Sequence, residues 1–205
     1  MEFNVKSLIG RINTLKNVIA RARNYKTVPV NITEYLPCGY KSGKAIPEKD
    51  AFIKYDGFWG GAPDAHAWFR FTADVEEING FYSAIEISDE EEFVKRWDAA
   101  NPQFMPYVNG ELMQGIDVNH RFFKIGGGKK EVYVYAYNGA KIFKPLKIFV
   151  NVLYRSQETE YFYEQTEMIL NYTSLFNEWD ENASRAVNAL NEAYKLVDFL
   201  EPKSE

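Results

Sequence analysis

The chain has 205 residues, of which 46% are hydrophobic and 16% aromatic, and its formal net charge is −5. A chain of this length can build one ordinary domain with a sizeable core and some further elements. The acidic balance argues against a general nucleic-acid binder, because phosphate contacts need clustered Lys and Arg. No apolar run approaches the roughly 18 residues of a membrane-spanning helix, so we expect neither a nucleic-acid partner nor a membrane.

The expected cellular location follows from two further features. Cys38 is the single cysteine, so no internal disulfide can form. The amino-terminal residues lack the continuous apolar core and the small-residue cleavage site of a secretory signal. Both features are typical of a protein of the reducing cytoplasm, and we expect a cytoplasmic location.

Residues 1–26 form the first predicted segment, an amphipathic helix. Apolar residues recur at spacings of three and four along residues 4 to 24, and basic residues occupy the opposite side. Such a helix can lie on a membrane surface or dock on its own protein. We expect docking, because the apolar stripe is aliphatic and lacks Trp or Phe at its centre.

Residues 27–155 form a strand-rich second segment. In "HAWFRFTADV" the residues alternate between two faces, one of them much more apolar, and this period of two predicts a strand. Similar short runs follow up to residue 155, separated by turns rich in Gly and Asn and without intervening helices. This spacing predicts an antiparallel β-sandwich or jelly roll. The run "KTVPVNIT" contains Pro29 and is predicted to lie at a sheet edge.

Residues 156–205 return to helical periodicity. The later part is the clearer, because its apolar residues fall on one face of a helix. These residues are Ala183, Val187, Leu190, Tyr194 and Val197. We therefore expect helices at both ends of a mainly β chain.

Two turn motifs lie inside the strand-rich segment. The run "KIGGGKKE" resembles a phosphate-binding loop in composition, but such a loop needs a following helix whose amides face the anion. Here "EVYVYAY" follows, with strand alternation, so we predict a glycine hairpin turn. Asn109-Gly110, between "FMPYV" and "ELMQG", is the stronger hairpin signal, because a type I′ turn needs positive φ at both central residues.

We assign no catalytic residue and no metal ligand from the sequence. The two histidines, His66 and His120, each have an aspartate nearby, Asp64 and Asp117, but neither pair forms an H-E-x-x-H motif. No G-x-S-x-G elbow is present. Cys38 lies in a turn-rich loop without a flanking helix or basic cluster to lower its pKa.

Aromatic and polar side chains gather in "YDGFWGGAPDAHAWFR". Flat aromatic rings pack against the C–H groups of sugar rings, and carboxylates bond to sugar hydroxyls, so these residue types suit sugar recognition. We expect Trp68 in the core, whereas Trp59 lies between glycines and fits either a core or a binding position. A further loop of this kind contains Trp97, Asp98 and Asn101.

Three long segments, in this order, carry a family resemblance: "GFWGGAPDAHAWFRF", "RWDAANPQFMPYVNGELMQGIDVNHR" and "KKEVYVYAYNGAK". They resemble the amino-terminal region of the glycoside hydrolase family 38 alpha-mannosidases, in the cytosolic and bacterial branch. The opening helix and the final "VNALNEAYKLVDFLEP" fit too, so the resemblance covers nearly the whole chain. It implies a mainly β fold, a galactose-binding-like jelly-roll β-sandwich with flanking amino- and carboxy-terminal helices.

The resemblance also implies a function. The family removes mannose from alpha-mannosides with retention, and its catalytic domain uses zinc or another divalent metal. That domain begins near a G-H-x-H-x-D motif, which this sequence lacks. We therefore expect a non-catalytic domain without a cofactor of its own, inactive alone, whose residues 156–205 lead toward the missing catalytic domain. Its expected roles are assembly and substrate positioning, and its expected partners are that catalytic domain and mannose-containing glycans.

Two groups of residues are candidates for touching sugar. The first group lies in the turn "QGIDVNHR" and comprises Asp117, Asn119, His120 and Arg121; the second comprises Trp59, Asp64 and His66. A purely structural domain interface is the competing explanation for the turn, and an independent carbohydrate-binding module is the alternative function. Apolar surface that a missing domain would cover also predicts self-association.

Overall fold

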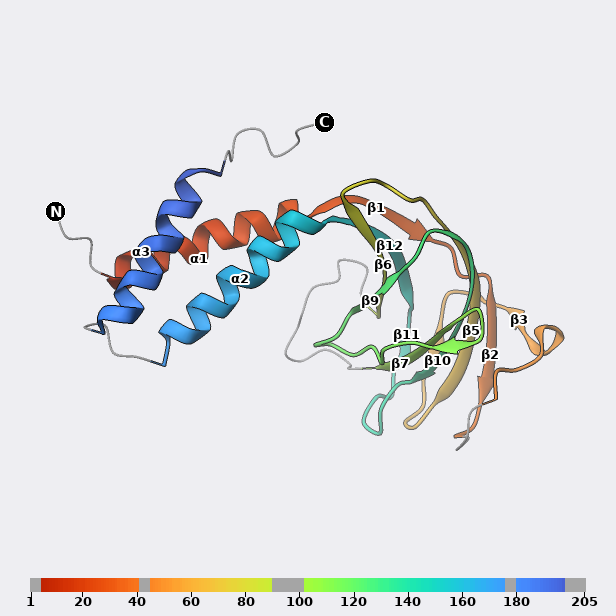
Figure 1. Ribbon diagram of the computed structural model, residues 1–205. Helices are drawn as coiled ribbons and strands as arrows, with labels where there is room; N and C mark the ends of the chain where they lie inside the picture. The colour runs from red at the N-terminus through yellow and green to blue at the C-terminus, as the bar shows by residue number, and fades with distance from the viewer. Residues whose placement is uncertain (1–4, 41–44, 90–101, 176–179, 198–205) are drawn as a thin grey trace. The chain divides into compact units, whose positions relative to one another are not determined.

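The computed structural model describes residues 5–40, 45–89, 102–175 and 180–197, and the chain divides into two compact units. Residues 26–154 form one unit, which we call the sandwich unit. Residues up to 25 and from 155 onward form the other, which we call the helical unit. Figure 1 labels most of the elements of both units.

The sandwich unit contains two main sheets. The first has the strand order β1 (Asn24–Val30), β12 (Phe149–Ser156), β6 (Phe81–Ser88), β9 (Phe122–Ile125). The second has the order β3 (Ile53–Lys54), β2 (Glu34–Cys38), β5 (His66–Val75), β10 (Gly128–Tyr137), β7 (Gln103–Val108), β8 (Glu111–Leu112). A small third sheet pairs β11 (Pro145–Leu146) with β4 (Trp59–Gly60), and a short 3-10 turn covers Lys49–Ala51. The predicted mainly β, jelly-roll sandwich with flanking helices is confirmed.

The main core is built from the inner faces of both sheets. Phe69 and Val134 of the second sheet and Ile85 and Val152 of the first are all almost completely buried in one cluster. Each such side chain contributes about 1.5–3 kcal/mol through burial. The alternation predicted for β5 is present, but its polar face is not wholly exposed, because Trp68 on that face is buried in a second cluster.

Two predictions about local chain geometry are confirmed. The strand that contains Pro29, β1, lies at the edge of its sheet, where a missing amide donor is tolerated. Asn109 and Gly110 both have positive φ, 49° and 89°, and join β7 to β8 with Val108 paired to Glu111. The hairpin signal therefore placed both strands correctly.

The glycine run between β9 and β10 is not a hairpin turn, and this prediction was wrong. β9 pairs with β6 in the first sheet, with Phe122 opposite Glu86, whereas β10 pairs with β5 and β7 in the second sheet. The run therefore carries the chain from one sheet to the other. Gly128, at φ 92°, supplies the left-handed backbone conformation that this crossing uses.

The helical unit consists of α1 (Val5–Ala22), α2 (Gln157–Thr173) and α3 (Glu181–Lys195). The side chains of Ser156 and Asp180 accept hydrogen bonds from backbone amides in the first turns of α2 and α3, as helix caps do. The three helices share a core, whose fully buried members are Leu8, Ile12, Ile19, Val187, Leu190 and Tyr194. The amino-terminal helix thus docks on its own chain, as expected.

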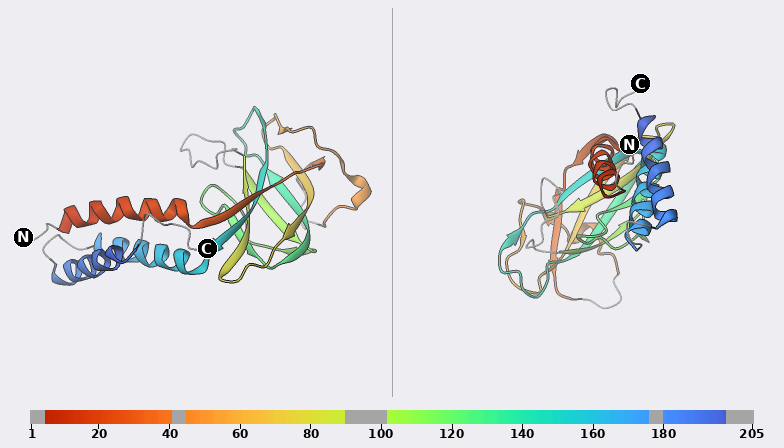
Figure 2. Two further views of the ribbon diagram at one scale, coloured as in Figure 1. Left: turned by 90° about the horizontal axis from the view of Figure 1, so that it is seen from above. Right: turned by 90° about the vertical axis from the view of Figure 1, so that its left-hand side faces the viewer.

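Ion pairs fix how α1 and α2 lie alongside each other (Figure 2). Lys16 lies 3.2 Å from Glu167, and Arg23 lies 3.4 Å from Glu160, so the two helices run antiparallel. Glu160 is buried and also lies 3.7 Å from Arg155. Although the sequence was divided into a separate first helix and a later helical connection, the two segments form one structural unit. No helix among the described residues is long and apolar enough to span a membrane.

We predict that Gly110→Ala destabilises the sandwich unit by about 1–2 kcal/mol, because a Cβ in the left-handed region meets its own backbone. Gly115→Ala is the matched control: both sites have open space around an added Cβ, but Gly115 has no positive φ. We expect the control to change stability by less than about 0.5 kcal/mol. Urea unfolding followed by tryptophan fluorescence measures both, and equal effects would contradict the turn assignment.

Candidate functional site

The outer face of the second sheet carries its side chains in rows across the strands. Residues that pair in antiparallel strands point to the same side of the sheet, so the register defines each row. Cys38 pairs with His66, His66 with Tyr137, and Tyr137 with Gln103. A thiol, an imidazole, a phenol and a carboxamide therefore line up across four strands at one end of the sheet.

The next two rows are closed by packing. Trp68 and Tyr135 lie opposite each other in the second row, and Tyr133 and Tyr107 in the third. All four are less than 10% exposed, and Phe52 packs against Tyr133 with ring centroids 5.9 Å apart. The middle of this face is therefore a second apolar core and presents no ring to a ligand.

An ion network lies on the same face, with Arg70 in the row of Tyr133. Arg70 donates to Glu34 and, at 2.8 Å, to Glu131, which also lies 2.8 Å from Lys49. The hydrogen bond to Glu131 raises the pKa of Arg70, although burial acts in the opposite direction. Hydrogen bonds from Lys49 and Arg70 likewise lower the pKa of Glu131. These charges satisfy one another, so the row of His66 is where the face offers partly exposed polar and aromatic groups together.

At that end, five side chains form what we call the His66 cluster: Tyr40, Asp64, His66, Tyr135 and Tyr137. The His66 ring stacks on Tyr137, with centroids 4.8 Å apart and planes inclined by 21°. A 2.9 Å hydrogen bond joins the Tyr135 hydroxyl to His66 Nδ1. The Tyr40 ring lies 5.7 Å from His66 and is 71% exposed. The cluster is therefore anchored below by Tyr135 and open above at Tyr40.

Asp64 brings a carboxylate to the cluster. Its Oδ1 accepts a 2.6 Å hydrogen bond from the Tyr137 hydroxyl, and this bond raises the pKa of Tyr137. The backbone of Asp64 has φ 55°, a left-handed conformation that Asp tolerates better than most residues. The loop before β5 thus turns the carboxylate back over the ring pair.

Asn138 holds that loop in place and is fully buried. Its Oδ1 accepts from the Ala65 amide, and its Nδ2 donates to the Ala62 carbonyl, both at 2.8 Å. Its own amide donates to the Ala65 carbonyl, and the Asp64 amide donates to the Gly139 carbonyl. These bonds tie the loop before β5 to the end of β10, so Asn138 acts as a positioning residue.

The turn of Asp117 to Arg121, the first predicted candidate, contains several hydrogen bonds between its own groups. Asp117 Oδ1 accepts from the amides of Asn119 and His120, at 2.7 and 2.8 Å, and lies 3.2 Å from His120 Nδ1. Arg121 Nε donates to the Val118 carbonyl. This arrangement is an Asx-type turn, in which the Asp117 carboxylate bonds to amides of its own turn. It decides neither for a sugar contact nor for a domain interface.

Burial would raise the pKa of Asp117, but the hydrogen bonds from His120 and Asn119 outweigh it and lower the pKa below its ordinary value. The folded state therefore binds fewer protons than the unfolded state when the pH approaches this pKa. The stabilising contribution of the carboxylate is present above about pH 4, the usual pKa of Asp, and is lost as the pH falls through the folded-state value.

Trp59 was a candidate for touching sugar, and the structure corrects this assignment. The side chain is 2% exposed and packs edge-on against Phe69, with centroids 5.6 Å apart. Its Nε1 donates to the Lys147 carbonyl. A ring enclosed on all sides cannot stack on a ligand, so Trp59 belongs to the core. The other predicted loop residues, Trp97, Asp98 and Asn101, lie outside the described residues.

The structure does not bring the two aspartate–histidine pairs into one metal site. Among the described residues, no group of three or more His, Cys, Asp or Glu side chains could hold a metal ion. Asp64 and His66 are instead joined through Tyr137 in the His66 cluster, and Asp117 and His120 share their turn. Zinc-type chemistry therefore has no ligand set in the described part of the chain.

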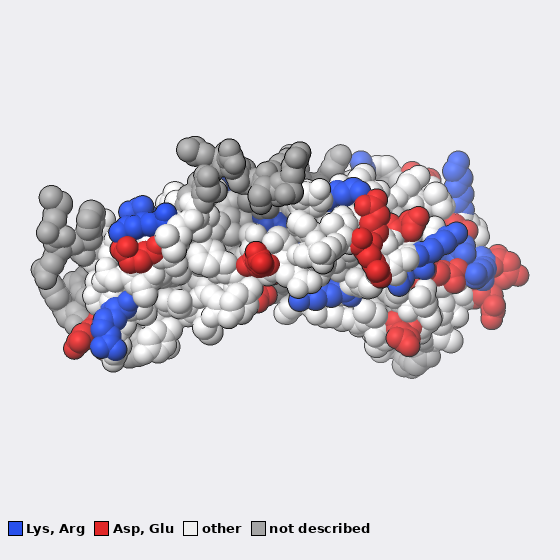
Figure 3. Space-filling view, turned by 45° about the horizontal axis from the view of Figure 1, so that its top comes forward, with Lys and Arg blue, Asp and Glu red and all other residues white. Residues whose placement is uncertain are grey.

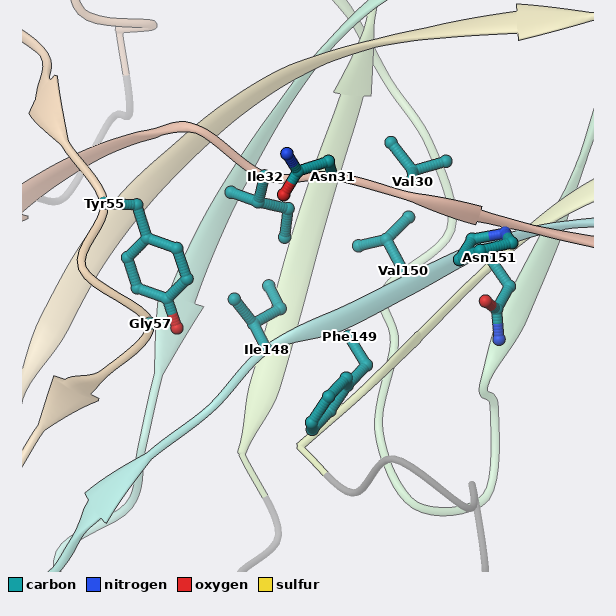
Figure 4. Close-up of a pocket in the computed structure, with 10 residues that line it drawn as sticks. Val30, Asn31, Ile32, Tyr55, Gly57, Ile148, Phe149, Val150 and Asn151 are labelled. Carbon is teal, nitrogen blue, oxygen red and sulfur yellow. The ribbon is translucent and has the colours of Figure 1, made fainter.

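A pocket of about 420 Å³ lies elsewhere in the sandwich unit, lined by residues 29–32, Tyr55, Gly57 and residues 148–151 (Figure 4). Burial raises the pKa of Tyr55 to about 12, although the Ile148 backbone acts in the opposite direction. Figure 4 shows Val150 on one side of β12 and Phe149 and Asn151 on the other. None of the predicted candidate residues lines this pocket, and none of its lining residues carries a charge.

Sequence reasoning found Asp64 and His66 but missed Tyr40, Tyr137 and Asn138. The alternating tyrosines of "EVYVYAYNG" were a usable signal, because every second residue of a strand faces the same side. What the sequence could not show is that the last of them, Tyr137, lies opposite His66, since that depends on the register between two strands far apart in the sequence.

Comparisons with known proteins give no family for the chain. No family model matches it, and no curated protein matches it. Among solved structures, it is similar to a family 35 carbohydrate-binding module from an environmental isolate, at 11% identity over 62% of this chain and 91% of that chain, with a TM-score of 0.29.

Two further solved structures show the same low level of similarity. The family 35 module from Cellvibrio japonicus Abf62 is 9% identical, over 64% of this chain and 97% of that chain, with a TM-score of 0.30. CBM51-2 with INT domains from Clostridium perfringens ZmpB, in complex with GlcNAc, is 12% identical, over 83% and 41%, with a TM-score of 0.24. These TM-scores are too low to carry an inference about function.

We predict that Asp117→Asn destabilises the protein at neutral pH, and that the difference from the unaltered protein shrinks as the pH falls below about 4. The physical reason is that the unaltered carboxylate becomes protonated in this range and loses its advantage over a neutral amide. Urea midpoints at several pH values measure it. His120→Ala is the control: it removes one partner and spares both backbone bonds, so its effect should be smaller. A pH-independent difference would contradict the prediction.

Proposed function

We propose that the sandwich unit binds a carbohydrate through the His66 cluster. The single observation that carries this proposal is the stacked ring pair of His66 and Tyr137 beside the Asp64 carboxylate, with the exposed Tyr40 ring at its edge. The geometry of this cluster alone supports the proposal, since the similar structures are too distant to do so.

The chemistry of a sugar matches these groups. One face of a pyranose ring presents C–H groups, which pack on an aromatic face, while its edge presents hydroxyls that both donate and accept hydrogen bonds. Tyr40 offers a ring that is mostly open to solvent, and Asp64 offers a carboxylate as an acceptor. A few polar groups fixed beside aromatic surface is the usual composition of a small-ligand site.

The site is also held rigid, which lowers the entropy cost of binding. Tyr135 is buried and bonds to His66, and Asn138 ties the loop of Asp64 to the end of β10. The ring pair sits on paired strands rather than on a loop. Binding would therefore order few groups beyond Tyr40.

We predict that the full chain binds an oligosaccharide on a glycan array and in calorimetric titration. Tyr40→Ala should weaken binding by about threefold to tenfold, the value of one aromatic contact. Asp64→Asn should weaken it by about tenfold or more, because a charged acceptor is lost while Asn still tolerates a left-handed backbone.

The matched control is Tyr25→Ala, which removes a ring of similar exposure, 55%, from β1 in the other sheet. We expect this variant to bind as the unaltered chain does. The proposal is contradicted if no glycan binds, or if the Tyr40 and Asp64 variants bind as tightly as the control.

A second candidate function is favoured by the sequence segments that resemble family 38 alpha-mannosidases. Under this proposal the chain is the non-catalytic amino-terminal domain of such an enzyme, and the metal-bearing catalytic domain is its partner. The segments fall on β5, on the hairpin of β7 and β8, and on β10, which are the strands around the His66 cluster. Mannose-containing glycans are then the first ligands to titrate.

We predict that the chain alone shows no turnover of a chromogenic mannoside, with or without added zinc or cobalt, because the described residues offer no metal ligand set. Activity that survives repurification would contradict this prediction. A downstream reading frame that encodes a metal-bearing hydrolase domain would support the second candidate, and its absence from the gene would remove it.

A further inference from the structure

The second helix of the helical unit exposes a stripe of large apolar side chains. Tyr161, Met168, Tyr172 and Leu175 are 65%, 57%, 45% and 80% exposed. Their spacings of seven, four and three residues place them on one face of a helix. Leu175 lies in the turn that ends α2, where its amide donates to the Tyr172 carbonyl. We call these four residues the α2 stripe.

This face is turned away from the core of its own unit. The side of α2 that packs inward carries Phe162, Thr166 and Ile169. On the face drawn in Figure 3, the helical unit shows broad uncharged areas between a few charged side chains, whereas the sandwich unit mixes acidic and basic ones. An apolar stripe along an outer helix face is the usual sign of an interaction surface.

We propose that the α2 stripe binds the α2 stripe of a second copy of this chain. The two helices would cross antiparallel, with a two-fold axis near Met168, so that each Met168 faces the other. This goes beyond the self-association expected from the sequence, since it names the surface, the symmetry and the residue on the axis. It does not depend on the proposed sugar site.

The sequence of α2 is self-complementary about Met168. Seven residues before the axis is Tyr161 and seven after it is Leu175, so an aromatic ring faces an aliphatic side chain. Four residues before the axis is Glu164 and four after it is Tyr172, so a carboxylate faces an aromatic side chain and not a second acid. Three residues before the axis is Gln165 and three after it is Asn171, so two carboxamides face each other. In an isologous interface every such pair occurs twice.

Charge also permits this pairing. Glu160 and Glu167 are held by Arg23 and Lys16 of the same unit. Glu164 lies at the edge of the stripe and faces a tyrosine rather than another acid. No two like charges therefore face each other across the proposed interface, where they would weaken binding.

The size of the proposed interface limits the affinity of the dimer. From Tyr161 to Leu175 the stripe is about 21 Å long, at 1.5 Å per residue. One helix pair of this length is smaller than a standard stable interface of about 800 Å² per partner. We therefore expect a reversible dimer with a Kd in the micromolar range.

Sedimentation velocity of the full chain, from about 1 µM to about 300 µM, should show a concentration-dependent monomer–dimer equilibrium. Met168→Glu should weaken the dimer by about tenfold or more, because two carboxylates then face each other on the axis. Leu196→Glu is the matched control, since it places the same charge at an exposed leucine after α3 and outside the stripe. Circular dichroism checks that both variants keep their helices.

A charge-swap experiment tests the symmetry itself. Met168→Lys alone should also weaken the dimer, but an equal mixture of the Glu and Lys variants should restore it, because opposite charges then meet on the axis. A monomer at all concentrations, or a dimer that Met168→Glu leaves intact, would overturn the proposal. So would a mixture that stays monomeric, which would show that Met168 does not face itself.

Discussion

The ten-residue antiparallel pairing of β5 with β10 is the constraint on which both cores of the sandwich unit depend. From Gly128 opposite Val75 to Tyr137 opposite His66, the register is unbroken. It sends Phe69 and Val134 into the main core and Trp68 and Tyr135 into the second one. A slip of one residue would exchange the two faces, so neither cluster would survive it.

The proposed site is an outcome of the same register. His66 and Tyr137 are the last pair of the ladder, where the sheet face is no longer closed by neighbouring rows. Beyond this pair the chain leaves the sheet on both strands, and the buried amide of Asn138 binds the two departing segments together. The paired strands are rigid, and the loop at their end carries the Asp64 carboxylate. Many binding sites are built in this way, with functional side chains on loops that a rigid scaffold holds in position.

Strand periodicity and turn chemistry made much of the fold predictable. β5 and β7 follow the expected runs closely, and the hairpin at Asn109-Gly110 is present, because each depends on local residues only. The glycine run between β9 and β10 was misassigned because a turn signal does not tell which sheet the next strand joins. Trp59 was misplaced for a similar reason: glycines on both sides indicate a loop, but not whether the core closes over it. The His66 cluster needed the register, which no local pattern contains.

The helical unit is assembled from segments far apart in the sequence, since Ile12 of α1 shares a core with Val187 of α3. During synthesis α1 is made before both of its docking partners, since α2 begins at Gln157, about 135 residues after α1 ends at Ala22. At a synthesis rate of roughly 5–20 residues per second, the apolar side of α1 stays without its partner helices for on the order of 10–30 s. The nascent chain therefore offers chaperones an amphipathic basic helix throughout the time in which the sandwich unit is made.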